Sequence, residues 1–152
     1  RGDPLAAGVR ALHSIGLTVV VSAGNGGPGS GTITSPGISP YAITVGGADT
    51  NGDAPSVSEF SSRGPCNGLA KPDLLAPAED IVCAYNRSYA AFTGTSIAAP
   101  IVAGACARLI SDHPTFTPDR VKEELKKHAA HMPGSIDNVG SGLLGIVPPE
   151  SP

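Results

Sequence analysis

The sequence predicts an α/β protein with a mainly parallel sheet flanked by helices. Residues 17–21 and 41–45 are short apolar runs without polar alternation, which is typical of parallel strands covered on both faces. A helical pattern over residues 1–16 leads directly into the first run, and a helix that feeds a buried strand is half of a βαβ unit. Two further helical patterns, over 95–111 and 117–130, complete the set of elements expected of this class.

Composition and charge exclude several classes of function. The chain has 152 residues with 10 Lys and Arg against 13 Asp and Glu, and its net charge of −3 argues against a nucleic-acid partner. No apolar run reaches the roughly 18 residues of a bilayer span, so no membrane partner is expected. The 20 glycines and 15 prolines interrupt the apolar segments, which predicts many tight loops rather than disorder.

The opening helix has signals at both ends. Asp3 is a candidate N-cap, Pro4 occupies the first helical position, and Gly16 ends the helix. The apolar residues that recur at helical spacing are Leu5, Val9, Leu12 and Ile15. No strand precedes this helix, and a βαβ unit needs one, so we expect the sequence to begin partway through a larger α/β domain.

Sheet-forming segments dominate the middle of the chain. Residues 22–40 are too rich in glycine and proline for a regular element, and a long loop of this kind often carries function. Further short strands are expected at 74–76, 81–83, 89–93 and, near the end of the chain, within 140–147.

The two later helices differ in character. The helix from Thr95 to about Ser111 consists almost wholly of apolar or small residues, so we expect it to be buried on nearly all sides. The second has Thr117 as its N-cap and exposes its Glu and Lys residues to water.

Three cysteines are present, and they cannot all pair within one chain. Cys66, Cys83 and Cys106 also lack the spacing of a zinc site, so we interpret them mainly as small core residues. A Cys66–Cys83 disulfide stays open for a secreted protein, because spacing alone does not decide it.

The segment Gly94-Thr95-Ser96-Ile97-Ala98-Ala99-Pro100 is the strongest chemical signal. A hydroxyl nucleophile gains from the first turn of a buried helix, where unpaired N–H groups and the helix dipole favour a nearby oxyanion. Gly94 would allow a substrate to approach closely. The alternative is that Thr95 or Ser96 simply caps the helix, which is the commoner role for a serine at a helix start.

A second signal is Ser22-Ala23-Gly24-Asn25, at the end of a predicted buried strand. Active-site groups in open α/β sheets usually lie at this position, and the Asn25 amide can donate a hydrogen bond to developing negative charge. The alternative is an asparagine that tolerates a left-handed turn in a glycine-rich loop.

Together these segments resemble the subtilisin-like serine peptidases, the subtilases. The segment from Gly94 to Pro100 is similar to the nucleophile motif of that family, and Ser22 to Asn25 is similar to its oxyanion-asparagine motif. Phe60-Ser61-Ser62-Arg63-Gly64-Pro65 and Lys71-Pro72-Asp73-Leu74-Leu75-Ala76-Pro77 resemble two further family segments in the same order. The resemblance implies a serine endopeptidase with a subtilisin-like fold.

The resemblance also implies roles for individual residues. Ser96 would attack the scissile carbonyl, while its backbone N–H and the side chain of Asn25 would hold the oxyanion. Thr95 would shape the leaving-group side. The substrate pocket would have one wall at Ser22, Ala23 and Gly24 and the other at Thr34, Ser35, Pro36 and Gly37, with Gly94 beside the nucleophile. The Ser35–Pro36 peptide bond falls where the family often has a cis bond, so we expect cis there.

The triad of the family is incomplete in this chain. Subtilases order it as Asp, His and Ser, yet the only upstream histidine, His13, lies within a helix and outside any His-Gly-Thr context. Residues 1–147 are therefore interpreted as the C-terminal portion of a subtilase catalytic domain whose N-terminal half is missing, with 148–152 as a tail. We expect the chain to be inactive on peptides alone, to need that N-terminal half as a partner, and to expose an apolar face.

The resemblance implies less about cofactors and location. No cofactor is certain, and no side-chain metal site is predicted. Calcium is expected only as family members bind it, through backbone carbonyls, because the turn over 49–53 has its glycine in the wrong place for a calcium loop. Localisation is unknown from the residues, and secretion is suspected from the family.

Three alternatives to the peptidase hypothesis remain open at this point. Gly24 to Gly29 fits the dinucleotide-binding pattern GxGxxG, but no helical stretch follows it. Ser96, Asp119 and then His128 and His131 follow the order of an α/β-hydrolase esterase, although the sequence after Ser96 is mostly two helices. A noncatalytic subtilase-like module or pseudoenzyme that binds peptides is the third alternative.

Overall fold

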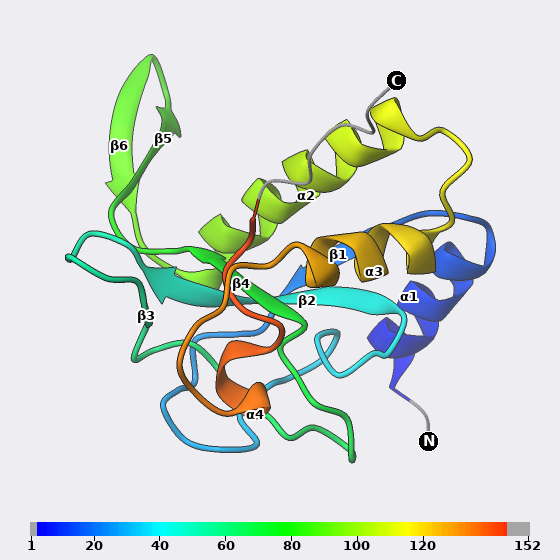
Figure 1. Cartoon of the computed structure of the whole chain (residues 1–152), viewed down its shortest axis with the longest axis horizontal. Helices are drawn as coiled ribbons and strands as arrows, with labels where there is room; N and C mark the ends of the chain where they lie inside the picture. Colours follow the sequence, from blue (N-terminus) through cyan, green and yellow to red (C-terminus); the bar gives the residue numbers. More distant parts are fainter. Residues whose placement is uncertain (1–2, 146–152) are drawn as a thin grey trace.

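The computed structural model describes residues 3–145 of the chain (Figure 1). Its helices and strands follow one another in the order α1 (Pro4–Ser14), β1 (Val19–Ser22), β2 (Ala42–Asp49), β3 (Ser56–Val57), β4 (Leu74–Pro77), β5 (Ile81–Tyr85), β6 (Ser88–Phe92), α2 (Thr95–Asp112), α3 (Pro118–Lys127) and α4 (Ile136–Val139). The predicted tail, 148–152, and the last two residues of the predicted strand at 140–147 lie outside the described residues.

Strand β2 is the centre of a mainly parallel sheet. It pairs in parallel with β1, where Val20 opposes Ile43, and with β4, where Gly46 opposes Leu75. The short β3, which the sequence pattern did not predict, adds an antiparallel pair at the end of β2. Residues 42–48 are buried, as expected for a strand covered on both faces.

Helix α2 covers one face of this sheet together with α3 (Figure 1). Its buried residues recur every three or four positions and pack on the side chains of β2, β4 and α3. The apolar ones are Ala98, Val102, Cys106 and Leu109, and Thr95 is buried at the start of the helix. Asp3 and Thr117 accept hydrogen bonds from first-turn N–H groups of α1 and α3, which confirms both predicted N-caps.

The chain returns to the sheet after α3. Leu143 forms isolated bridges with Leu75 of β4 and with Ala130, in place of the predicted last strand. Helix α4, which the pattern did not predict, contributes Val139 to a second, smaller core on Ala48, Leu75 and Met132.

Two burial predictions were wrong. Residues 19–22 of β1 are only half-buried, because β1 pairs with β2 alone and forms an edge of the described sheet. Helix α2 is exposed along a second face that includes Ala103, Gly104 and Ala107. Apolar positions on α1 and just after it are also exposed, with Leu5 58%, Ile15 73% and Leu17 50% accessible. No segment of the described chain therefore covers these small and apolar surfaces.

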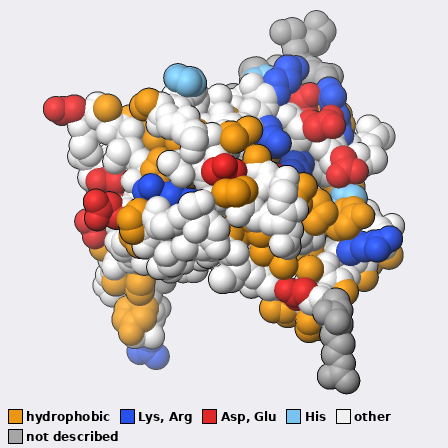
Figure 2. Space-filling view, turned by 90° about the horizontal axis from the view of Figure 1, so that it is seen from below, with side chains coloured by type: hydrophobic (Ala, Val, Ile, Leu, Met, Phe, Trp, Pro, Cys, Tyr) orange, Lys and Arg blue, Asp and Glu red, His pale blue; other side chains and the backbone are white. Residues whose placement is uncertain are grey.

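Strands β5 and β6 form a separate antiparallel hairpin that projects from the domain (Figure 1). Its side chains are largely exposed, including Val82, Tyr85 and Tyr89. Figure 2 shows hydrophobic side chains gathered along an arm that projects from the molecule at the lower left. No helix of the described residues is long and apolar enough to cross a membrane.

The three cysteines are free thiols, so the Cys66–Cys83 disulfide is not formed in this structure. Cys66 and Cys106 are buried, as expected for small core residues, whereas Cys83 is half-buried in the hairpin. Burial raises the pKa of Cys106 to about 11 and also raises that of Cys66, so both thiols stay protonated at neutral pH.

Candidate active site

Ser96 lies in the first turn of α2, and its side chain is exposed. The helix starts after Gly94, whose N–H donates to the carbonyl of Ala78 at 2.8 Å, directly after β4. This bond ties the start of α2 to the carboxyl end of the sheet. The Ser96 N–H belongs to the first turn, where backbone donors have no acceptor within the helix, and no hydrogen bond between described residues uses it.

Asn25 comes to the same place from the loop after β1. Its Oδ1 accepts hydrogen bonds from the Thr95 N–H at 3.0 Å and the Thr95 hydroxyl at 2.8 Å. A backbone N–H only donates, so the atom that faces it must be the amide oxygen. The Nδ2 group therefore points to the other side, and its two protons are not used by any hydrogen bond within residues 3–145.

Gly94 marks the space between these groups. A Cβ built on it would lie 3.3 Å from Ser96 Oγ, 3.5 Å from Asn25 Nδ2 and 3.9 Å from the Ser96 nitrogen. A hydroxyl, a side-chain N–H and a backbone N–H thus surround one point. The φ of Gly94 is 150°, a value that side chains disfavour, so glycine is required there for conformation as well as for space.

The two predicted walls of the substrate pocket are brought together. Ala23 extends the β1 ladder by donating to Val45 O at 2.8 Å, and Gly24 N–H donates to the Thr95 hydroxyl at 3.3 Å. A Cβ on Gly24 would lie 3.6 Å from Thr34 Oγ1, so Thr34 faces this strand end. Of the remaining predicted residues, Ser22 ends β1, and the Ser35–Pro36 bond before Gly37 is cis as predicted.

Ser62 holds the loop of Asn25 from behind, a contact that the sequence pattern did not predict. Its N–H donates to Gly24 O at 2.9 Å, and its hydroxyl accepts from Gly26 N–H at 3.0 Å. The segment from Phe60 to Pro65 resembles a family motif, but nothing in its pattern identifies which side chain makes these bonds.

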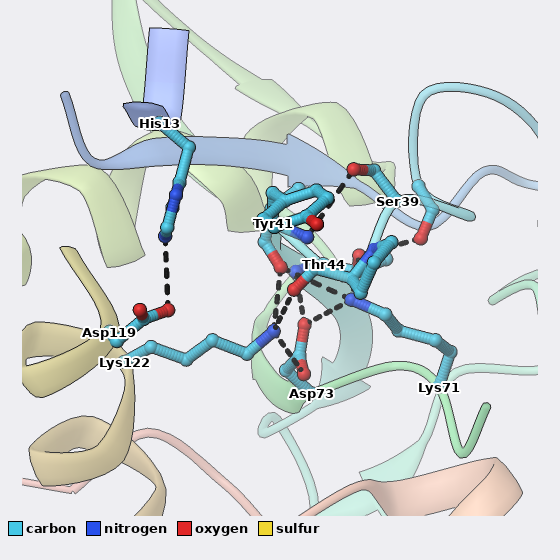
Figure 3. Close-up of polar contacts among 11 residues, drawn as sticks. His13, Ser39, Tyr41, Thr44, Lys71, Asp73, Asp119 and Lys122 are labelled. Carbon is cyan, nitrogen blue, oxygen red and sulfur yellow. Dashed lines mark hydrogen bonds and ion pairs between the residues drawn. The ribbon is translucent and has the colours of Figure 1, made fainter. Parts of the chain in front are cut away.

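His13 lies at the amino-terminal end of the strands, whereas Ser96 lies at their carboxyl-terminal end. It stands near the end of α1, its ring centroid is 5.2 Å from that of Tyr41, and Tyr41 precedes the first residue of β2. Its Nε2 lies 3.0 Å from Asp119 Oδ1 at the start of α3 (Figure 3). Ser96 follows the carboxyl ends of the strands, so His13 is not placed to take its proton.

The structure also argues against the esterase alternative, because its Asp and His candidates contact other residues than Ser96. Asp119 pairs with His13, whereas His128 caps the far end of α3 and its Nδ1 lies 3.0 Å from the Glu124 carbonyl. The dinucleotide alternative fails because the loop after Gly24 runs to β2 without a helix in the described structure.

A buried ion cluster joins the segment that enters β4 to helix α3 (Figure 3). Lys71 Nζ lies 2.6 Å from Asp73 Oδ2, and Lys122 Nζ lies 2.9 Å from Asp73 Oδ1. Lys71 is 2% exposed and Asp73 5%, an environment in which charges persist only when paired. Burial lowers the pKa of Lys71 to about 8, although the charge of Asp73 opposes this shift. The segment Lys71-Pro72-Asp73 belongs to a family-like motif, but its pattern did not predict the pairing.

No group of three or more His, Cys, Asp or Glu side chains in residues 3–145 is placed to hold a metal ion. In the turn over 49–53, the Asp49 carboxylate accepts from the Asn51 N–H at 2.9 Å. Calcium bound through backbone carbonyls stays a prediction.

An exposed serine at the start of a helix, beside N–H donors at the carboxyl ends of parallel strands, is the arrangement expected of an α/β serine hydrolase. The model of the subtilase family matches residues 3–142. The chain therefore belongs to the subtilase family of serine peptidases.

Relatives and solved structures agree with this assignment. The chain is 43% identical to serine protease AprX of Bacillus subtilis (strain 168) over an alignment of 163 positions, which covers 93% of the chain and 37% of that protein. It is 35% identical to a subtilisin of Bacillus pumilus over 88% of the chain and 46% of that protein. The S41 psychrophilic protease shares the fold with a TM-score of 0.85 at 24% identity, covering 96% of this chain and 53% of that one. The prenylagaramide maturation protease PagA has a TM-score of 0.80 at 26% identity, covering 96% of this chain and 54% of that one. The chain thus spans between about a third and a half of the relatives' length.

Replacing Gly94 by alanine is expected to lower kcat/KM by at least about 10²-fold in the complete protein, the effect of losing an oxyanion donor. The added methyl group would fill the space between Ser96 Oγ and Asn25 Nδ2 and strain the backbone. Peptide-anilide kinetics measure this. Gly52→Ala is the matched control, because Gly52 lies in an exposed turn with its nearest such contact at 3.9 Å. Equal activity of the two variants would contradict the proposed position of the oxyanion.

Proposed function

We propose that this chain supplies the nucleophile and the oxyanion donors of a subtilisin-like serine endopeptidase. Ser96 Oγ attacks the scissile carbonyl carbon, the carbonyl electrons move to its oxygen, and the Ser96 N–H and Asn25 Nδ2 hydrogen-bond the resulting oxyanion. A general base from the preceding residues of the complete protein takes the Ser96 hydroxyl proton and delivers it to the leaving amine as the intermediate collapses. The resulting acyl-enzyme is then hydrolysed by water. The convergence of Ser96 Oγ and Asn25 Nδ2 on the point beside Gly94 is the observation that carries the proposal.

The substrate is a peptide or protein in extended conformation. Ser22, Ala23 and Gly24 continue an edge strand, so their backbone can pair with a peptide, while Thr34, Ser35, Pro36 and Gly37 form the opposite wall of the pocket for the residue before the cut. Thr95 orients Asn25 through two hydrogen bonds and borders the leaving-group side.

The general base and its acid partner come from residues that precede this segment in the complete protein. A serine hydroxyl without a positioned imidazole is a poor nucleophile at neutral pH, and His13 lies at the opposite end of the strands from Ser96. The half-exposed edge of β1 and the exposed apolar faces of α1 and α2 supply a surface for that N-terminal half. Secretion belongs to the same proposal, and its test is recovery of the protein from the culture medium.

The chain alone is expected to show no turnover of a peptide anilide, whereas the protein that also contains the preceding residues of its gene is expected to hydrolyse it. An Asp motif followed by His-Gly-Thr is expected in those residues. Circular dichroism of the isolated chain verifies that lack of turnover is not lack of folding. Turnover by the folded chain alone, abolished by Ser96→Ala, would show that the base lies within it.

The noncatalytic alternative keeps the same surfaces but not the chemistry. A pseudoenzyme has no need for an exposed serine, an amide with unused protons and a glycine-lined gap at one point, so the arrangement favours catalysis. Peptide binding by the complete protein without any Ser96-dependent hydrolysis would favour the alternative.

A further inference from the structure

Thr44 connects the buried ion cluster to the proposed pocket wall. Its side chain is buried in β2, and its Oγ1 lies 2.9 Å from Lys71 Nζ and 2.8 Å from the carbonyl oxygen of Gly37 (Figure 3). Gly37 is the last residue of the 34–37 wall. The hydroxyl therefore lies between a buried ammonium group and the backbone of the substrate pocket.

The direction of these hydrogen bonds is determined by chemistry. An ammonium group only donates, and the three protons of Lys71 point to Asp73 Oδ2, Thr44 Oγ1 and Ala42 O, at 2.6, 2.9 and 3.1 Å. The Thr44 hydroxyl accepts from Lys71, so its single proton goes to Gly37 O. A donor polarised by an adjacent cation makes a stronger hydrogen bond than an isolated hydroxyl.

The ion cluster holds the Thr44 hydroxyl in a defined position. Asp73 is held by Lys71 and Lys122, and its Oδ2 also accepts the Thr44 N–H at 2.7 Å. Lys122 reaches from α3 and donates to Ala42 O at 2.8 Å. Strand β2, helix α3 and the segment that enters β4 therefore meet at one carboxylate.

The wall has little room to move independently of Thr44. A Cβ on Gly37 would lie 3.0 Å from Thr34 O and 3.2 Å from Thr44 Cγ2, so the backbone is packed against this side chain. Thr34, at the other end of the wall, faces Gly24 of the opposite wall. A displacement of the Gly37 backbone would therefore be transmitted to Thr34 and change the distance between the two proposed walls.

We propose that Thr44 is a positioning residue that couples the Lys71–Asp73–Lys122 cluster to the pocket wall. It thereby determines the enzyme's preference for the substrate side chain that precedes the scissile bond. This inference rests on the proposed peptidase function. Thr44 touches no reacting atom, so its effect is on substrate binding and selectivity rather than on the chemical step.

The test compares two peptide anilides that differ only in phenylalanine or alanine before the scissile bond. In the complete protein, Thr44→Val is isosteric but lacks the hydroxyl. We expect its KM for the phenylalanine substrate to rise about three- to tenfold, the range for one lost hydrogen bond, with kcat within about twofold. The alanine substrate makes less use of the wall, so its KM should change less than about twofold. Thr44→Ser keeps the hydroxyl and is expected to restore the wild-type values.

A second variant keeps the inference testable if Thr44→Val does not fold. Lys71→Met leaves the neutral pair of Asp73 and Lys122 but removes the donor to Thr44. The Thr44 hydroxyl can still donate to Gly37 O, so a rise in KM with the same selectivity but smaller than that of Thr44→Val is expected. Unchanged kinetics on both substrates, or an equal loss on both that follows the loss of thermal stability, would overturn this inference. In either case, wild-type hydrolysis that still depends on Ser96 leaves the proposed function standing, whereas hydrolysis independent of Ser96 removes that function itself.

Discussion

Replacing Ser96 by alanine is expected to lower kcat of the complete protein by about 10⁶-fold, the magnitude known for the nucleophile of subtilisin, which belongs to the same family. The variant loses the hydroxyl that lies with Asn25 Nδ2 beside Gly94, while its backbone N–H, the other proposed oxyanion donor, remains. The side chain is exposed, so the thermal unfolding temperature should change little. Hydrolysis of a peptide anilide and labelling of Ser96 by a fluorophosphonate measure the effect.

The same helix supplies the matched control. Ser111 is also an exposed serine of α2, but it lies fifteen residues further along, or about 22 Å at 1.5 Å per residue. Ser111→Ala should keep full activity and full labelling. Labelling that persists in Ser96→Ala would place the nucleophile elsewhere and end the proposed mechanism.

Asn25→Asp is expected to lower kcat by about 10²–10³-fold with KM nearly unchanged, the magnitude known for loss of the oxyanion asparagine in subtilisin, a member of the same family. The carboxylate keeps an oxygen for the Thr95 N–H and hydroxyl, so the loop stays anchored. It replaces the donating Nδ2 with a negative charge beside the forming oxyanion, which affects the transition state alone. Steady-state kinetics on a peptide anilide separate kcat from KM.

Two further variants separate donation from anchoring. Asn25→Ala removes both, so it should lose as much activity and also lower the unfolding temperature, because the Thr95 N–H loses its acceptor. Asn86→Asp makes the same chemical change in the exposed turn of the β5–β6 hairpin, so it should leave both kcat and the unfolding temperature unchanged. An Asn25→Asp variant with wild-type kcat would show that this amide does not bind the oxyanion.

Much of the fold followed from local patterns. The β2 run, the capped starts of α1 and α3 and the long loop before β2 depend on neighbouring residues, and all are present where the patterns predicted them. The prediction that β1 and α2 are fully buried was wrong, and the cause was not local. An apolar residue shows that a surface should be covered, but not whether the covering segment belongs to the same chain.

Some residues of the candidate site were also predictable from the sequence, and others were not. Residue types and motif spacing were enough to single out Ser96 and Asn25. Ser62, Thr44 and the Lys71–Asp73 pair were missed as individual contributors, because their contacts join segments that lie 27 to 38 positions apart or depend on burial. A lysine in a polar-looking segment is normally a surface residue, and no local pattern shows that it is 2% exposed.

The sequence by itself determined the family, the strand and helix types, and the residues that carry hydroxyl, amide and glycine functions, because these depend on composition and local spacing. Only the tertiary structure decided that the Asn25 oxygen accepts from Thr95 while its nitrogen lies beside the space next to Gly94, and that His13 lies at the opposite end of the strands from Ser96. It also decided that a buried ammonium group is hydrogen-bonded to Thr44, which in turn donates to the Gly37 carbonyl. These are statements about direction and burial, which arise when distant segments pack together and are therefore not encoded at any single position.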